Sequence, residues 1–116
     1  MPNIQGKYLT PYVSGVDDIG DNVGEIGRFM ARVLKLPINI QNVFRNFSTA
    51  EFIEERLGEK LNLSRDQKEM ITNLIREVLL GEIFIGDFTK SIQAKLTVDE
   101  NKARDIASMI VAELFP

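Results

Sequence analysis

One tight group of acidic side chains, Asp17, Asp18 and Asp21, lies just ahead of a predicted helix. Carboxylates can bind Ca²⁺, but a calcium-binding loop places them at alternating positions and follows them with glycine, D-x-D-x-D-G. The spacing here does not match that pattern. Negative charge at the start of a helix is favourable because it interacts with the positive end of the helix dipole. We therefore interpret the three aspartates as helix-stabilising and predict no metal site.

The chain has 116 residues, which predicts one domain, and it contains no cysteine and no histidine. It can form neither a Cys–His pair nor a Ser–His–Asp triad, while carboxylate or lysine chemistry stays open. The glycines between Gly15 and Gly27 do not form the phosphate-binding motif G-x-x-x-x-G-K-[S/T]. We expect no catalytic residues and no cofactor, and we predict that the protein is not an enzyme.

Four basic side chains lie along the first two predicted helices: Arg28, Arg32, Lys35 and Arg45. Such an edge can bind anions, either nucleic-acid phosphates or an anionic membrane surface. The formal net charge is −3, which argues against nucleic acid as the main partner, because nucleic-acid binding usually shows as a basic surplus. A solvated helix face is the commoner reason for such an edge. Nucleic-acid binding and peripheral membrane attachment stay as alternatives, neither of them favoured.

The elements that must position these side chains are all predicted to be helices. Apolar residues recur at helical spacing, and no run alternates with the period of a strand. The predicted helices cover about 22–36, 38–47, 49–61, 65–80, 88–96 and 100–114. Polar N-cap residues mark their starts: Asp21, Ser48, Ser64, Asp87, and either Thr97 or Asp99. The predicted fold class is all-α, a compact bundle of five or six helices preceded by an extended N-terminal arm over residues 1–20.

An apolar segment, Leu79–Phe88, joins two similar helical hairpins that we place at about 48–81 and 85–115. When the sequence is aligned with itself at a constant shift, Ser64 aligns with Asp99 and Ile75 aligns with Ile110. A one-residue gap then aligns Phe52 with Phe88. We predict that residues 83–85 of the joining segment are buried between the hairpins. Two hairpins joined in this way can pack as a quasi-symmetric four-helix unit.

The second half of the chain also resembles a known family through its core and turn positions. The residues that carry the resemblance are Leu63, Asp66, Gln67, Ile75, Leu79, Leu80, Gly81, Phe88, Leu96, Ala103, Ile106, Ala107, Leu114 and Phe115. Over about residues 53–115 the chain resembles a helical domain that recurs in hypothetical proteins of candidate-phyla-radiation bacteria. The resemblance implies a bacterial protein. That family has no established activity, so the resemblance implies no functional residues.

We predict a protein–protein interaction, assembly or scaffold module that binds a protein partner or itself, and we expect a homo-oligomer. The arm is irregular but apolar, and small residues follow one stripe of the first helix of the domain at 21–116. Such stripes allow close approach of another helix. The predicted contacts between chains are Ile4, Tyr8, Leu9, Tyr12, Gly24, Gly27 and Phe29. With no apolar run of about 18 residues and no signal peptide, we expect a cytoplasmic protein.

Overall fold

The protein is all-helical over residues 10–115, which are the residues that the computed structural model describes. The order begins with α1 (Pro11–Ile19), α2 (Val23–Leu34) and α3 (Ile38–Arg45). One continuous segment follows, made of α4 (Phe47–Glu51), the π-helical η2 (Phe52–Leu57) and α5 (Gly58–Lys60). Then come α6 (Arg65–Leu79), the 3-10 turn η3 (Ile85–Asp87), α7 (Phe88–Leu96) and α8 (Glu100–Leu114). With α4, η2 and α5 taken as one, these residues form 7 helices and no strand.

The helix that the sequence pattern did not predict is α1. The extended arm expected over residues 1–20 is therefore wrong for residues 11–19. The hydroxyl oxygen of Thr10 accepts a hydrogen bond from the backbone N–H of Val13 at 3.2 Å, and Pro11 occupies the first helical position. Proline is favoured there because its missing N–H is not needed. Ile4, Tyr8 and Leu9 lie outside the described residues.

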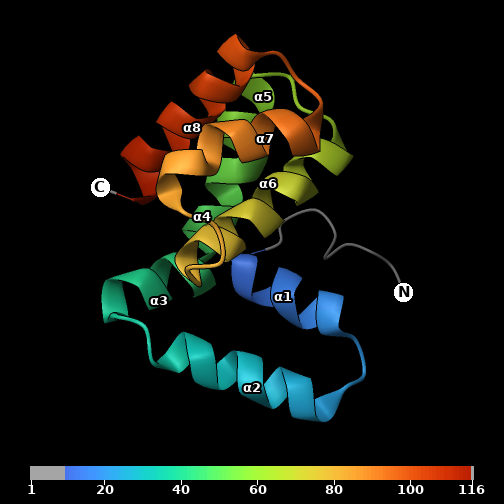
Figure 1. Ribbon diagram of the computed structural model, residues 1–116, viewed down its shortest axis with the longest axis vertical. Helices are drawn as coiled ribbons and strands as arrows, with labels where there is room; N and C mark the ends of the chain where they lie inside the picture. The colour runs from blue at the N-terminus through green and yellow to red at the C-terminus, as the bar shows by residue number, and fades with distance from the viewer. Residues whose placement is uncertain (1–9, 116) are drawn as a thin grey trace.

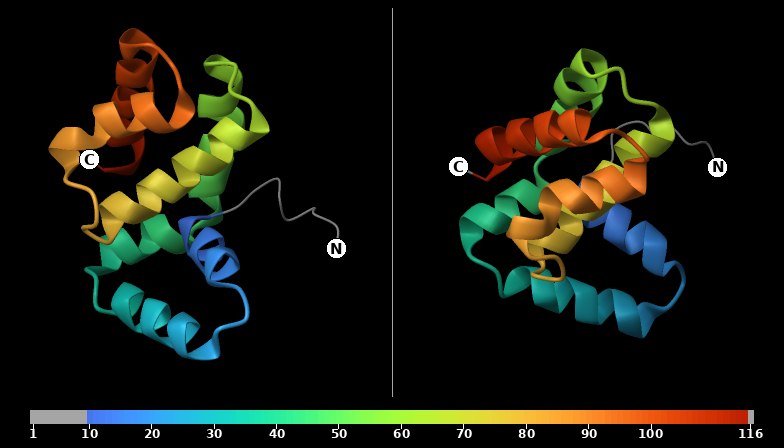
Figure 2. Two further views of the ribbon diagram at one scale, coloured as in Figure 1. Left: turned by 45° about the vertical axis from the view of Figure 1, so that its right-hand side comes forward. Right: turned by 45° about the horizontal axis from the view of Figure 1, so that its top comes forward.

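In Figure 1, α7 and α8 lie at one end of the molecule and α2 lies at the other, and α2 stays at that edge in both views of Figure 2. The larger hydrophobic cluster is built from η2, α6, α7 and α8, and its fully buried side chains include Leu57, Ile75 and Ile106. A smaller cluster holds Phe29 of α2, Val33 of α2 and Phe44 of α3, with side chains of α1 against it. Leu79 packs against both clusters, so α6 connects them.

Helix starts follow the predicted capping chemistry at α6 and α8 and differ from it at α2, α4 and α7. Ser64 and Gln67 form a reciprocal capping box at α6, and the Asp99 carboxylate accepts a hydrogen bond from the Lys102 N–H at 2.8 Å. Asn22 caps α2 and Asn46 caps α4, where Asp21 and Ser48 were predicted. At α2 the asparagine one position after the predicted cap takes the role, and at α4 the asparagine two positions before it does, since the side-chain carbonyl oxygen of asparagine accepts the same kind of bond. Asp87 makes no side-chain cap at α7.

The π-helical segment η2 explains an irregular apolar spacing. Phe52 and Leu57 are both buried although five positions separate them in the sequence, too many for one turn of an α-helix. A π-helical turn, closed by i→i+5 hydrogen bonds, accommodates the additional residue. The equivalent pair in α7, Phe88 and Ile92, is one residue closer and lies in an ordinary α-helix.

The joint after α6 differs from its prediction. Gly81 ends α6 with a φ of +80°, a left-handed conformation that favours glycine. The N–H groups of Glu82 and Ile83 then both donate to the Glu77 carbonyl, at 2.8 and 3.3 Å, which holds this backbone against α6. Ile83 packs on the larger cluster, but Phe84 is 72% exposed. The expected burial of residues 83–85 is therefore wrong beyond Ile83, because the chain has already passed the edge of the core.

Candidate interaction surfaces

Phe29 was predicted to contact a partner, and the fold places it in the smaller hydrophobic cluster instead. Its ring is 7% exposed, with its centroid 5.6 Å from that of Tyr12 and 6.1 Å from that of Phe44. Gly15 of α1 lies directly against this ring. Phe29 therefore attaches α2 to α1 and α3 and is not available to another molecule.

The contact between Gly15 and Phe29 predicts the effect of a side chain at Gly15. A Cβ atom there would lie 2.4 Å from Cζ of Phe29. We expect Gly15→Ala to lower the free energy of unfolding by about 1–3 kcal/mol, because the buried ring must move. Urea denaturation measures the change. Gly27→Ala is the control: nothing lies within 4 Å of its Cβ position, and alanine should raise stability by about 0.5–1 kcal/mol. Unchanged stability of Gly15→Ala would contradict close packing here.

A polar network fixes α1 on α6. The guanidinium of Arg76 donates to the Asp18 carboxylate at 3.0 Å, to the Ser14 hydroxyl at 3.1 Å and to the Asn73 side-chain oxygen at 3.2 Å. The Ser14 hydroxyl donates to the same Asn73 oxygen. The Arg76 side chain is only 14% exposed, so these hydrogen bonds offset the cost of removing its charge from water. Asp18, from the predicted acidic group, therefore has a structural role.

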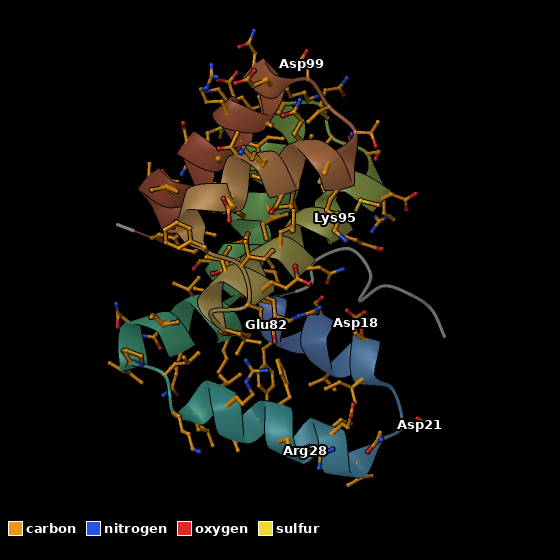
Figure 3. The ribbon with its side chains drawn as sticks, in the orientation of Figure 1. Asp18, Asp21, Arg28, Glu82, Lys95 and Asp99 are labelled. Carbon is orange, nitrogen blue, oxygen red and sulfur yellow. The ribbon has the colours of Figure 1, made fainter. Side chains whose placement is uncertain are left out.

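A pocket of about 410 Å³ separates α2 from α1 and the end of α6, and it is lined by charges of both signs. Arg32 pairs with Glu82 at 3.0 Å across the pocket, and Arg28 lies 3.7 Å from Glu25 on α2 itself. Figure 3 labels Asp18 on α1, Glu82 on the joint and Arg28 on α2, so the charged lining comes from several elements. Each arginine in the lining faces a carboxylate, so the pocket presents no surplus of positive charge to an anion.

The four predicted anion-binding residues are not gathered into one site. Arg28 and Arg32 share the mixed-charge pocket, while Arg45 lies with its guanidinium 5.3 Å from the Tyr12 ring centroid. Lys35 is exposed at the C-terminal end of α2 and has no ion-pair partner among residues 10–115. The arrangement therefore gives a dispersed set of cations, three of which are engaged within the chain.

One exposed side of α2 is apolar. We call Val23, Gly27, Met30 and Leu34 the outer stripe. At about 100° per residue these four positions fall within an arc of about 60° on the helix. The exposed fractions are 80% for Val23, 42% for Met30 and 61% for Leu34, and no atom lies within 4 Å of a Cβ at Gly27. Gly24, predicted as an interface residue, is also exposed beside this stripe.

A second apolar surface is a groove of about 510 Å³ between α3, the end of α6, the joint and the end of α8. Its apolar lining includes Ile40, Leu79, Ile85 and Phe115, with Glu113 at its edge. The sequence pattern did not indicate this groove, because its walls bring together α3, the α6 end with the joint, and the end of α8, which are far apart along the chain. Its lining is mainly apolar and contains no group of side chains with catalytic chemistry.

Within the described residues, no three His, Cys, Asp or Glu side chains are grouped to hold a metal ion. None of the helices in this part of the chain has the length and apolarity needed to cross a bilayer. No protein-family model, curated protein or solved structure matches the chain. The resemblance of residues 53–115 to a bacterial helical domain therefore stays a prediction.

Proposed function

We propose that this protein is an interaction module that binds a protein partner through the outer stripe of α2. The observation that carries the proposal is a second apolar face on this helix: Phe29 and Val33 are already buried in the smaller cluster, yet the side chains of the outer stripe face solvent. A surface helix ordinarily places charged side chains outward and apolar ones inward. An exposed apolar surface of this kind is typical of a site that another molecule covers.

A protein is a better fit to the stripe than nucleic acid or a membrane surface. The stripe itself carries no cation, so it offers nothing to phosphates. A helix that lies on an anionic bilayer combines its apolar face with free Lys and Arg side chains beside it. The two arginines of α2 have carboxylate neighbours within 4 Å. Of the cations on this helix, Lys35 is the one that has no ion-pair partner within the described residues. These pairings reduce the positive charge available to lipid head groups.

The test compares substitutions at two methionines whose side chains are similarly exposed. Met30 in the stripe is 42% exposed and Met70 on α6 is 38% exposed, and glutamate suits a helix at both positions. We expect the wild type and Met70→Glu to bind the same partner protein from a source-cell extract, and again as purified components. Met30→Glu should bind it at least about tenfold more weakly, because a charge would be buried.

Two outcomes would overturn the proposal. One is binding of the same proteins, with the same affinity, by wild type, Met30→Glu and Met70→Glu. The other is co-flotation of the wild type with phosphatidylglycerol vesicles that Met30→Glu abolishes, which would assign the stripe to a lipid surface. Circular dichroism of each variant confirms that helix content is unchanged before binding is measured.

We also propose that the hairpins at 48–81 and 85–115 are two copies of one unit, which serves as the scaffold for α1–α3. Three equivalences support this proposal. Asn62 and Thr97 adopt left-handed φ values of 55° and 56°, each two positions before the N-cap of the next helix. The helices that follow, α6 and α8, both have 15 residues. The π-helical turn of η2 holds the one extra residue that the alignment requires. Homologous sequences in which the two hairpins do not align with each other would contradict the duplication.

A further inference from the structure

The outer stripe has a spacing that is the same in both directions. Its members, Val23, Gly27, Met30 and Leu34, are four, three and four residues apart. Alternating steps of three and four are the spacing by which one helix packs against another at a shallow angle. Because the order 4-3-4 is unchanged on reversal, two copies of α2 running in opposite directions bring all four positions into register.

The side-chain sizes also match in that antiparallel register. A two-fold axis midway between Gly27 and Met30 places each Met30 side chain against Gly27 of the second copy, where no atom of the chain occupies the Cβ position. The same axis places Val23 against Leu34 of the second copy. A parallel pair would instead set glycine against glycine and methionine against methionine, which leaves a gap in one layer and crowding in the next.

The charges at the two ends of α2 are complementary under the same operation. Asp21 precedes the N-cap of α2, and Lys35 is its C-cap. Neither has an ion-pair partner among the residues described, and Figure 3 shows Asp21 at the end of α2 far from α3. In an antiparallel pair, Lys35 of each copy lies beside Asp21 of the other. The two helix dipoles then run in opposite directions, which is also favourable.

We propose that the partner of the outer stripe is a second copy of this chain, bound with α2 antiparallel to α2 about a two-fold axis between Gly27 and Met30. This inference rests on the proposed function and names its partner. The helix is about 18 Å long at about 1.5 Å per residue, so the contact is smaller than a standard interface. We expect a weak dimer that dissociates on dilution.

The first measurement is the mass of the wild type by light scattering over a range of concentrations. We expect the weight-average mass to approach twice that of one chain at roughly millimolar concentration and to fall on dilution. Gly27→Leu should raise the dissociation constant at least about tenfold, because the added side chain fills the space for Met30 of the second copy. Its own fold should be preserved, since that position is open. A monomer mass for the wild type at the highest concentration would overturn the dimer.

Engineered cysteines test the direction of packing, because the natural chain has none. In the antiparallel pair, Val23 of one copy faces Leu34 of the other, whereas equal positions are offset by about 16 Å along the axis. A disulfide requires Cα atoms within about 7 Å. A mixture of Val23→Cys and Leu34→Cys, one carrying a size tag, should therefore form the mixed disulfide, while each variant alone should not. Disulfides in the single variants would indicate parallel packing and overturn the proposed register.

Failure of the dimer is distinguishable from failure of the proposed function. A monomeric wild type that still binds a foreign protein through Met30 would overturn only the identity of the partner. Met70→Cys, on α6, is the control for random collision and should form no disulfide under the same oxidation. Formation at Met70 equal to that of the mixture would show non-specific coupling and would also overturn the register.

Discussion

Phe88→Ala is expected to lower the free energy of unfolding by about 3–5 kcal/mol. Phe88 begins α7, is 2% exposed, and lies in the larger hydrophobic cluster with its ring centroid 6.2 Å from that of Phe115. Truncation removes buried apolar surface and leaves a cavity that α6, α7 and α8 can fill only by shifting. Equilibrium denaturation in urea, with the slope of the transition compared between variants, measures the loss.

Phe84→Ala is the matched control for this substitution. It removes the same kind of side chain from a position shortly before Phe88 in the sequence, but Phe84 is 72% exposed. We expect a change within about 0.5 kcal/mol, as for most surface substitutions. A loss at Phe84 as large as that at Phe88 would mean that another part of the protein, or a second molecule, covers the Phe84 ring in solution.

Phe44→Ala is expected to have a comparable effect, about 3–5 kcal/mol, through the smaller cluster. Phe44 is completely buried and meets the Phe29 ring edge-on at a centroid distance of 6.1 Å. Because Phe29 attaches α2 to the rest of the chain, loss of Phe44 also loosens the helix that carries the outer stripe. We expect backbone amides of α2 to exchange with deuterium faster in this variant, by a larger factor than those of α8.

The control for Phe44 is Phe47→Ala on the following helix. Phe47 is 55% exposed, so its truncation leaves no closed cavity and should cost about 1 kcal/mol or less. Equal acceleration of hydrogen exchange in α2 and α8 of Phe44→Ala would indicate that the two clusters unfold as one unit, and that α2 is not released separately.

Local signals accounted for most of the helices. In α6 and α8, N-cap residues at Ser64 and Asp99 and apolar positions at helical spacing define nearly the whole element, because both are properties of neighbouring residues. The same kind of signal was present for α1 in the pair Thr10–Pro11. Gly15 and Gly20, however, are typical of a loop, and on their account residues 1–20 were predicted to be an arm. Gly15 is in fact helical, and the position needs glycine because the Phe29 ring occupies the space where a side chain would be.

The candidate site could be predicted only in part. Gly24 and Gly27 were recognised as a small-residue surface of the right helix, and both are exposed. Val23, Met30 and Leu34 were not, because an exposed apolar residue and a buried one look identical in a sequence. Phe29 was assigned to a partner, and the fold buries it at 7% exposure. The sequence also did not show that Phe84 is exposed and Phe88 buried, because this depends on the direction that the chain takes after α6.

By itself the sequence determined the helical class of this protein, the positions of most helix ends and the absence of cysteine and histidine chemistry. These follow from the period of apolar residues, from capping side chains and from composition, which act over a few residues. Only the tertiary structure decided that α2 also carries an exposed apolar face. Apolar residues cover more of that helix than one buried face needs: Phe29 packs against Gly15 and Phe44 from other helices, while Val23, Met30 and Leu34 stay exposed.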